Sequence, residues 1–106
     1  MKGKVIDVKQ TCPFPGGRSR SDGPGNAEEF REDVLQPALE SEKFVTLDFS
    51  GIYGVGASFL EEAFGGLRRV HGYSQEELIT RLNVIADTDI ERTLIINSIK
   101  NYTKLP

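Results

Sequence analysis

The chain has 106 residues, of which 38% are hydrophobic and 27% charged, a composition typical of a small folded domain rather than a disordered chain. Its net charge of −3 argues against nucleic-acid binding, which needs a basic surface. The single cysteine, Cys12, excludes an internal disulfide; no apolar run approaches the ~18 residues of a membrane span, and the polar start does not resemble a secretion signal. We therefore expect one cytoplasmic domain over residues 1–106.

The first strand is predicted at residues 3–9, where Val5, Ile6 and Val8 gather. A proline- and glycine-rich segment, PFPGGRSRSDGPGN, follows at residues 13–26 and predicts a long loop. Loops longer than ~12 residues in compact domains are usually either functional or disordered. The sequence leaves both possibilities open.

The first helix is predicted to begin after Asn26, whose side chain caps it, with Glu29 completing a capping box. Pro37 has no backbone N–H, so we expect this helix to kink or end near Gln36. Apolar residues recur at helical spacing and form the predicted core stripe, which consists of Ala27, Phe30, Val34, Leu35, Ala38 and Leu39.

The second strand is predicted at residues 44–49 and the second helix at residues 57–70. Gly65 and Gly66 fall in mid-helix, where each costs roughly 1 kcal/mol relative to alanine, which predicts close packing against the sheet. Gly72 is the expected C-cap. The predicted core face holds Phe59, Leu60, Ala63, Phe64, Leu67 and Val70, and the predicted exposed face holds Glu61, Glu62, Arg68 and Arg69.

Ser74 and Glu77 predict the cap of a short helix that ends near Thr80, and residues 82–86 predict a third strand. Asp87 or Asp89 is expected to cap a final helix. Its predicted core face consists of Ile90, Leu94, Ile95, Ile99 and Tyr102.

Strands and helices alternate along the chain, which predicts an α/β domain with right-handed crossovers. We expect a small, mostly parallel central sheet of three to five strands, buried by flanking helices. Binding surfaces of such folds lie off the carboxyl ends of the strands. The loop after Phe49 occupies that position.

Two segments, RSDGPGNAEEFREDVLQPAL and LDFSGIYGVGASFLEEAFGGL, carry a resemblance to STAS-like domains, relatives of the anti-sigma-factor antagonists. The resemblance covers roughly residues 3–100 and is strongest to a small bacterial STAS-like family of largely unassigned function. It implies a STAS-like fold and a regulatory protein-interaction module without enzymatic activity.

In the antagonists, a serine at the start of the helix that follows this loop is phosphorylated by a kinase with a histidine-kinase-like ATPase fold, and the phosphate releases the partner. The equivalent residue here is Ser58, although Gly56 and Ala57 replace the Asp-Ser pair that precedes the antagonists' serine, and Phe59 replaces the following glycine. The alternative for Ser58 is a structural role, in which it caps the helix or packs near that cap. The partner surface implied by the resemblance consists of Gly54, Gly56, Ser58, Phe59, Glu61 and Glu62.

Arg18 and Arg20 in the long loop offer a second hypothesis, a small-anion or nucleotide sensor that also uses the amides near Ser58. The alternative is a solvated loop. The glycines after Phe49 match no phosphate-binding motif. Asp48 is expected to support that loop by accepting backbone hydrogen bonds.

The sequence offers no recognisable catalytic set. His71 is the only histidine, and Cys12 lies in no CxxC motif. We expect no enzymatic activity, no metal and no cofactor.

Overall fold

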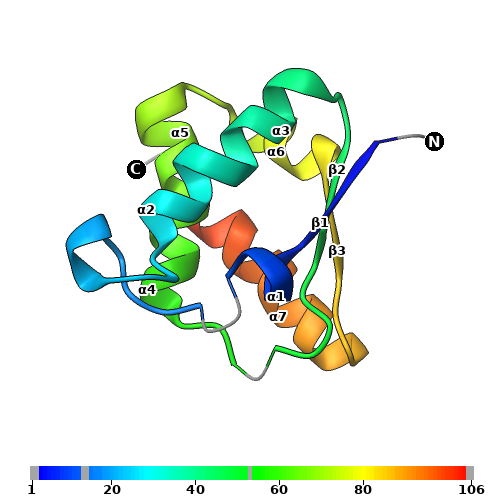
Figure 1. Cartoon of the computed structure of the whole chain (residues 1–106). Helices are drawn as coiled ribbons and strands as arrows, with labels where there is room; N and C mark the ends of the chain where they lie inside the picture. The colour runs from blue at the N-terminus through cyan, green and yellow to red at the C-terminus, as the bar shows by residue number, and fades with distance from the viewer. Residues whose placement is uncertain (1–2, 13–14, 53, 105–106) are drawn as a thin grey trace.

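A computed structural model describes residues 3–12, 15–52 and 54–104. Its three strands are β1 (Lys4–Asp7), β2 (Val45–Asp48) and β3 (Leu82–Ile85), in the order β1-β2-β3. Both strand pairs are parallel, and Ile6, Leu47 and Val84 lie side by side across the sheet. This confirms the predicted small parallel α/β sheet with helices packed on it (Figure 1).

Two long helices connect the strands, and each contains a wider π-helical segment. The first runs from Ala27 to Ser41, and the second runs from Ala57 to His71. Their parts are α2 (Ala27–Phe30), η2 (Arg31–Leu35) and α3 (Gln36–Ser41), then α4 (Ala57–Leu60), η3 (Glu61–Gly65) and α5 (Gly66–His71). The remaining helices are α1 (Val8–Thr11), the 3₁₀ turn η1 (Arg20–Asp22), α6 (Gln75–Arg81) and α7 (Asp89–Tyr102).

Of the two outcomes predicted near Gln36, a kink or the end of the first helix, the structure excludes the end, because the helix continues through Pro37 to Ser41. The wider turn of η2 ends at Leu35, two residues before the proline, and the Gln36 N–H donates to the carbonyl of Arg31. In a regular α-helix the proline ring clashes with the carbonyl four residues earlier. A wider turn separates the ring from that carbonyl, and we attribute the continuous helix to it.

The ends of two other elements also differ from the prediction. Strand β1 stops at Asp7, whose carboxylate accepts from the Gln10 amide at 3.3 Å and turns the chain into α1. Helix α7 is capped by Thr88, which accepts from the amide of Glu91 at 3.1 Å, and not by Asp87 or Asp89. The predicted caps Asn26, Ser74 and Gly72 are confirmed.

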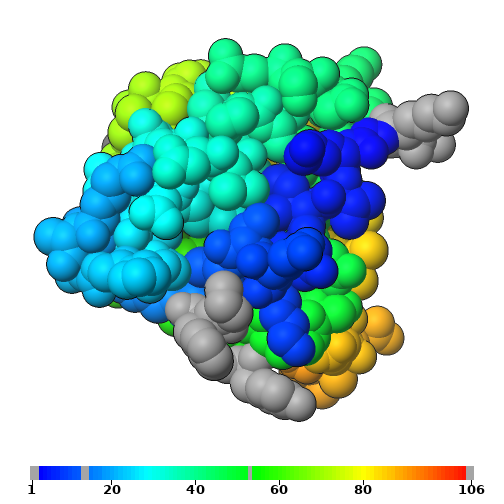
Figure 2. Space-filling model, viewed as in Figure 1, coloured from blue at the N-terminus to red at the C-terminus, as the bar shows by residue number. Residues whose placement is uncertain are grey.

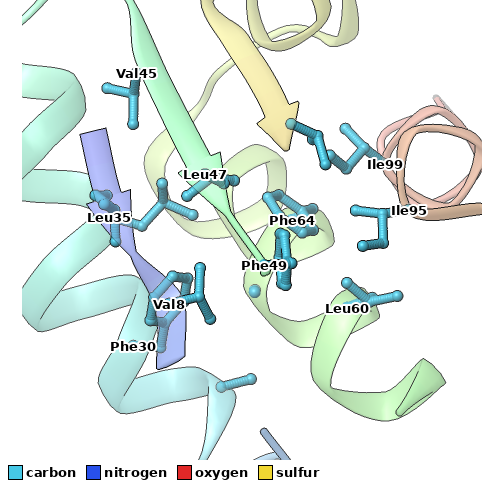
Figure 3. Packing of buried hydrophobic residues seen from close by; sticks show 14 of the residues in the cluster. Val8, Phe30, Leu35, Val45, Leu47, Phe49, Leu60, Phe64, Ile95 and Ile99 are labelled. Carbon is cyan, nitrogen blue, oxygen red and sulfur yellow. The ribbon is translucent and has the colours of Figure 1, made fainter. Parts of the chain in front are cut away.

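The hydrophobic core lies on one side of the sheet, where Ile6, Val45, Leu47 and Val84 are buried against the helices (Figure 3). The other side is open, with Val5 62% and Ile85 42% exposed. The expectation that the first two strands are mostly buried was therefore wrong for β1, in which only Ile6 is buried. The long helices pack on the same face, as Figure 1 shows, which leaves the other face of the sheet uncovered.

Helix α7 turns a narrower face to the core than predicted. Ile95 and Ile99 are buried and Tyr102 packs against the core, but Ile90 is 75% and Leu94 61% exposed. Both faces of this helix carry large aliphatic residues, so helical spacing alone selects a stripe that is too wide.

Candidate functional site

The loop between β2 and α4 leaves the carboxyl edge of the sheet, where the sequence places it. Asp48 accepts a hydrogen bond from the Ser50 amide at 2.9 Å, which confirms its predicted support of the loop. Asp87, which follows β3, accepts from the Gly51 amide at 2.9 Å. Gly51 has φ 79°, a conformation that favours glycine. The loop is thus held by carboxylates from two neighbouring strand ends.

Asp87→Ala is expected to reduce the free energy of unfolding by about 1 kcal/mol, because it removes a loop hydrogen bond at the sheet edge. It should also accelerate hydrogen exchange of the Gly51 amide. The matched control is Asp89→Ala, which removes an exposed carboxylate two residues further on. Equal exchange rates at Gly51 in both variants would contradict the role of Asp87.

Ser58 is the second residue of α4, and its side chain is exposed. The N-cap position belongs to Gly56, whose carbonyl accepts from the amide of Leu60 at 3.1 Å. The capping alternative for Ser58 was therefore wrong. Its hydroxyl faces solvent at the junction of the loop and the helix.

Phe59 does not belong to an exposed surface. Its side chain is fully buried, and its ring lies 5.6 Å from that of Phe30 between centroids. Its inclusion in the partner surface is therefore corrected. The residue anchors α4 on α2, because burial of a phenylalanine is among the largest single contributions to a core.

Glu61 and Glu62 are partly buried and bonded to arginines, whereas the sequence predicted a solvated face. Arg18 pairs with Glu61 and lies 3.3 Å from Glu62. Arg69 pairs with Glu61 from the next turns of the helix. Burial raises the pKa of Glu61, but the hydrogen bonds from Arg18 and Arg69 outweigh it, so the net shift is downward. Glu61 is therefore ionised at neutral pH.

Arg31 is the least expected residue of this region, because its charged side chain is only 4% exposed. Its guanidinium donates to the backbone carbonyl of Glu62 at 2.7 Å and to the Glu62 carboxylate at 2.6 Å. A second carboxylate, Glu32, accepts from it at 3.0 Å. These bonds satisfy a buried charge that would otherwise be costly.

The position of Arg31 explains a glycine in mid-helix. A Cβ atom on Gly66 would lie 2.7 Å from the Arg31 Cζ and 2.9 Å from its Cδ, closer than non-bonded carbons approach. The predicted close approach at Gly66 is real, but the neighbour is a guanidinium and not the sheet. The available signal was Arg31 itself, which interrupts the apolar stripe between Ala27 and Leu35.

The network continues to the only histidine. His71 Nε2 lies 2.6 Å from the Glu32 carboxylate, which also holds Arg31. Burial raises the pKa of Glu32, but the hydrogen bonds from His71 and Arg31 outweigh it and lower the pKa overall. We call Arg18, Arg31, Glu32, Glu61, Glu62, Arg69 and His71 the ion-pair network.

Residues 15–26 form an ordered segment whose backbone bonds to the start of α2. The amide of Ala27 donates to the Gly17 carbonyl at 3.2 Å, and Asn26 donates through its side chain to Gly23 at 2.8 Å. Figure 2 shows this segment against α2. Of the predicted loop 13–26, residues 13 and 14 lie outside the described residues.

Both arginines of the predicted anion site face carboxylates. Arg20 lies 3.1 Å from Asp33 and 3.6 Å from Glu29, while Arg18 is held by Glu61 and Glu62. An anion would have to displace these partners, so the geometry does not favour the anion-sensor hypothesis, which stays a prediction.

The surroundings of Cys12 do not activate its thiol. Cys12 is buried and donates from its thiol to the Gly25 carbonyl at 3.3 Å. Burial and then the charge of Glu29 raise the pKa of this thiol, so it is not a reactive thiolate at neutral pH. Among the described residues, no three His, Cys, Asp or Glu side chains gather into a group that could hold a metal ion.

Across residues 3–12, 15–52 and 54–104, no helix combines the length and the apolar character needed to cross a bilayer.

The parallel sheet and the loop that leads from β2 into α4 define a small α/β domain of the STAS-like class. A family model described as a STAS-like domain of unknown function (DUF4325) matches residues 26–101, and the chain belongs to this family. The match includes the whole of the second segment on which the resemblance rested and, from Asn26 onward, most of the first. Neither the curated proteins nor the solved structures contain a significant match to this chain.

Proposed function

We propose that this domain is a regulatory module without enzymatic activity, which binds a histidine-kinase-like ATPase or another signalling protein in the bacterial cytoplasm. Binding uses the loop from Ser50 to Ser58 and the outward side of the helix that follows. The observation that carries this proposal is the exposed Ser58 hydroxyl at the junction of loop and helix, on the carboxyl edge of the sheet.

The surroundings of Ser58 suit a phosphate that switches binding. The residue lies in the first turn of a continuous helix, where unpaired amides and the helix dipole favour negative charge. Glu61 and Glu62 follow one turn later, but Arg18 and Arg69 compensate their charges. A phosphate would add up to about two negative charges to the binding surface, and these charges would have to be desolvated when the partner binds.

The surface proposed for the partner follows from these positions. Gly54, Gly56 and Ser58 are exposed, while Glu61 and Glu62 offer only the parts that the arginines leave accessible. Phe59 is buried beneath this surface, where it packs against Phe30. The partner would therefore contact mainly the loop and the first turn of α4.

Ser58→Asp is expected to weaken partner binding at least about tenfold, which corresponds to ~1.4 kcal/mol, because it places in the interface a charge that must be desolvated on binding. The measurement is a pull-down from native lysate, read by mass spectrometry and followed by titration of the captured protein. The wild-type bait is also examined for a phosphate at Ser58.

The matched control is Asn83→Asp, which adds a negative charge with little change of shape on the open face of the sheet. Melting curves should show that all forms are folded. Equal capture of the same signalling protein by wild type, Ser58→Asp and Asn83→Asp would refute the switch at Ser58.

A further inference from the structure

An apolar groove of about 250 Å³ lies beside the proposed binding loop, between this loop and α7. Its walls are mainly aliphatic and come from Ile52, Val55 and Leu60 on one side and from Leu94 and Ile95 on the other. Leu60 and Ile95 lie close to Phe49 at the edge of the core (Figure 3). The groove is therefore an extension of the core surface that opens to solvent.

Helix α7 continues this apolar surface outward. Leu94 lines the groove while 61% exposed, and Ile90, one turn earlier, is 75% exposed. Their spacing of four residues places them on one side of the helix. Exposed aliphatic side chains next to a groove are typical of an interaction site.

Among the described residues that line the groove, the one charged side chain is acidic. It belongs to Glu91, and Asp87 and Asp89 lie close before Glu91 in the chain. Arg92 bonds instead to the carbonyl of Val84 on β3, at 2.8 Å. Acidic residues also stabilise the start of a helix, but that explanation does not account for two exposed aliphatic side chains beside them.

We propose that this groove anchors an amphipathic basic helix of the partner protein. Apolar side chains of that helix, spaced three or four residues apart, would enter the groove, and its lysines or arginines would face Asp87, Asp89 and Glu91. A second copy of this chain fits less well, because it would bring its own acidic residues against these. The inference rests on the proposed function and adds the chemistry of the partner.

The test uses two synthetic peptides of about 18 residues, long enough to form helices. Both carry leucines at helical spacing, and their remaining positions are lysine in one and glutamate in the other. Each is titrated into ¹⁵N-labelled protein. We expect the Leu/Lys peptide to shift the amide signals of residues 54–60 and 90–98 and to bind at least about tenfold more tightly than the Leu/Glu peptide.

Leu94→Ser should weaken the Leu/Lys peptide about tenfold or more, and the matched control is Val70→Ser, which removes another exposed aliphatic side chain from α5. Signal changes confined to other faces, equal binding of both peptides, or equal effects of the two substitutions would overturn the proposal. So would sedimentation showing a dimer that Leu94→Ser dissociates, because the occupant would then be a second copy.

The titration does not involve Ser58, so it separates the two proposals. Loss of partner capture in Ser58→Asp together with no peptide binding at the groove would leave the proposed function standing and reject the basic helix. Peptide binding at the groove with no effect of Ser58→Asp would reject the switch and support the groove.

Discussion

Gly66→Ala is expected to lower the free energy of unfolding by about 3 kcal/mol, whereas Gly65→Ala changes it by less than about 1 kcal/mol. On Gly66 the new methyl group would lie 2.7 Å from the Arg31 Cζ. Arg31 has no room to retreat, because Glu62 and Glu32 hold its guanidinium from two sides. The substitution therefore overpacks the site and strains a buried ion pair at once.

The neighbouring glycine supplies the matched control. A Cβ on Gly65 would meet the ends of Arg69 and Glu61, the nearest at 2.6 Å, and these side chains are flexible and partly exposed. A gain of roughly 1 kcal/mol in helix propensity offsets that contact and the closer approach to the Tyr102 carbonyl. Urea unfolding followed by circular dichroism measures both variants.

Making Gly66→Ala in a second protein, the Arg31→Ala variant, shows whether Arg31 causes the loss of stability. In an Arg31→Ala protein the guanidinium is gone, so Gly66→Ala should be neutral or stabilising there. A loss of the same size in both backgrounds would show that another contact excludes the methyl group at Gly66.

The parts of the fold that sequence patterns predicted are those decided by short-range chemistry. Asn26 and Ser74 accept hydrogen bonds from amides three residues later, and Gly72 adopts the left-handed conformation that ends a helix. Such interactions depend on neighbours in the chain, so the residue type and its spacing are sufficient. The parallel order of the strands likewise follows from their alternation with helices.

The errors occurred where a local pattern is compatible with more than one structure. Pro37 can end a helix, but here a π-helical segment lies just before it and the helix continues to Ser41. Ile90 and Leu94 have the spacing of a core stripe, but α7 has aliphatic residues all round and the sheet and α4 select Ile95 and Ile99 instead. Sequence spacing shows which residues share a face of a helix. It does not show which of those faces packs against the core.

The candidate site divides in the same way. The loop after β2, Asp48 and the position of Ser58 near the helix start could be predicted, because they depend on where a strand ends. The burial of Arg31 and its pairing with Glu62 could not, since the two residues are 31 positions apart. Glu61 and Glu62 were therefore assigned to a solvated face, although both are partly buried and form ion pairs with arginines.

Glu62→Leu is expected to cost about 3–4 kcal/mol of stability, and Arg31→Met about 2 kcal/mol. The first substitution removes a carboxylate from Arg31, whose side chain is 4% exposed. The second leaves a Glu62 that is 18% exposed and still has Arg18 within 3.3 Å. Each charge keeps another ionic partner, Glu32 for Arg31 and Arg18 for Glu62, so the more deeply buried charge suffers the greater loss.

The double variant Arg31→Met with Glu62→Leu should recover most of the stability, because apolar side chains of similar size replace a buried ion pair at little cost. Urea unfolding of all four forms gives the coupling energy, expected above about 1.5 kcal/mol, and additive losses would contradict a direct pair. The double variant also separates the two roles of Glu62. If the double variant is stable and still binds the partner, the Glu62 carboxylate has a structural role only. If the double variant is stable but no longer binds, the Glu62 carboxylate contacts the partner.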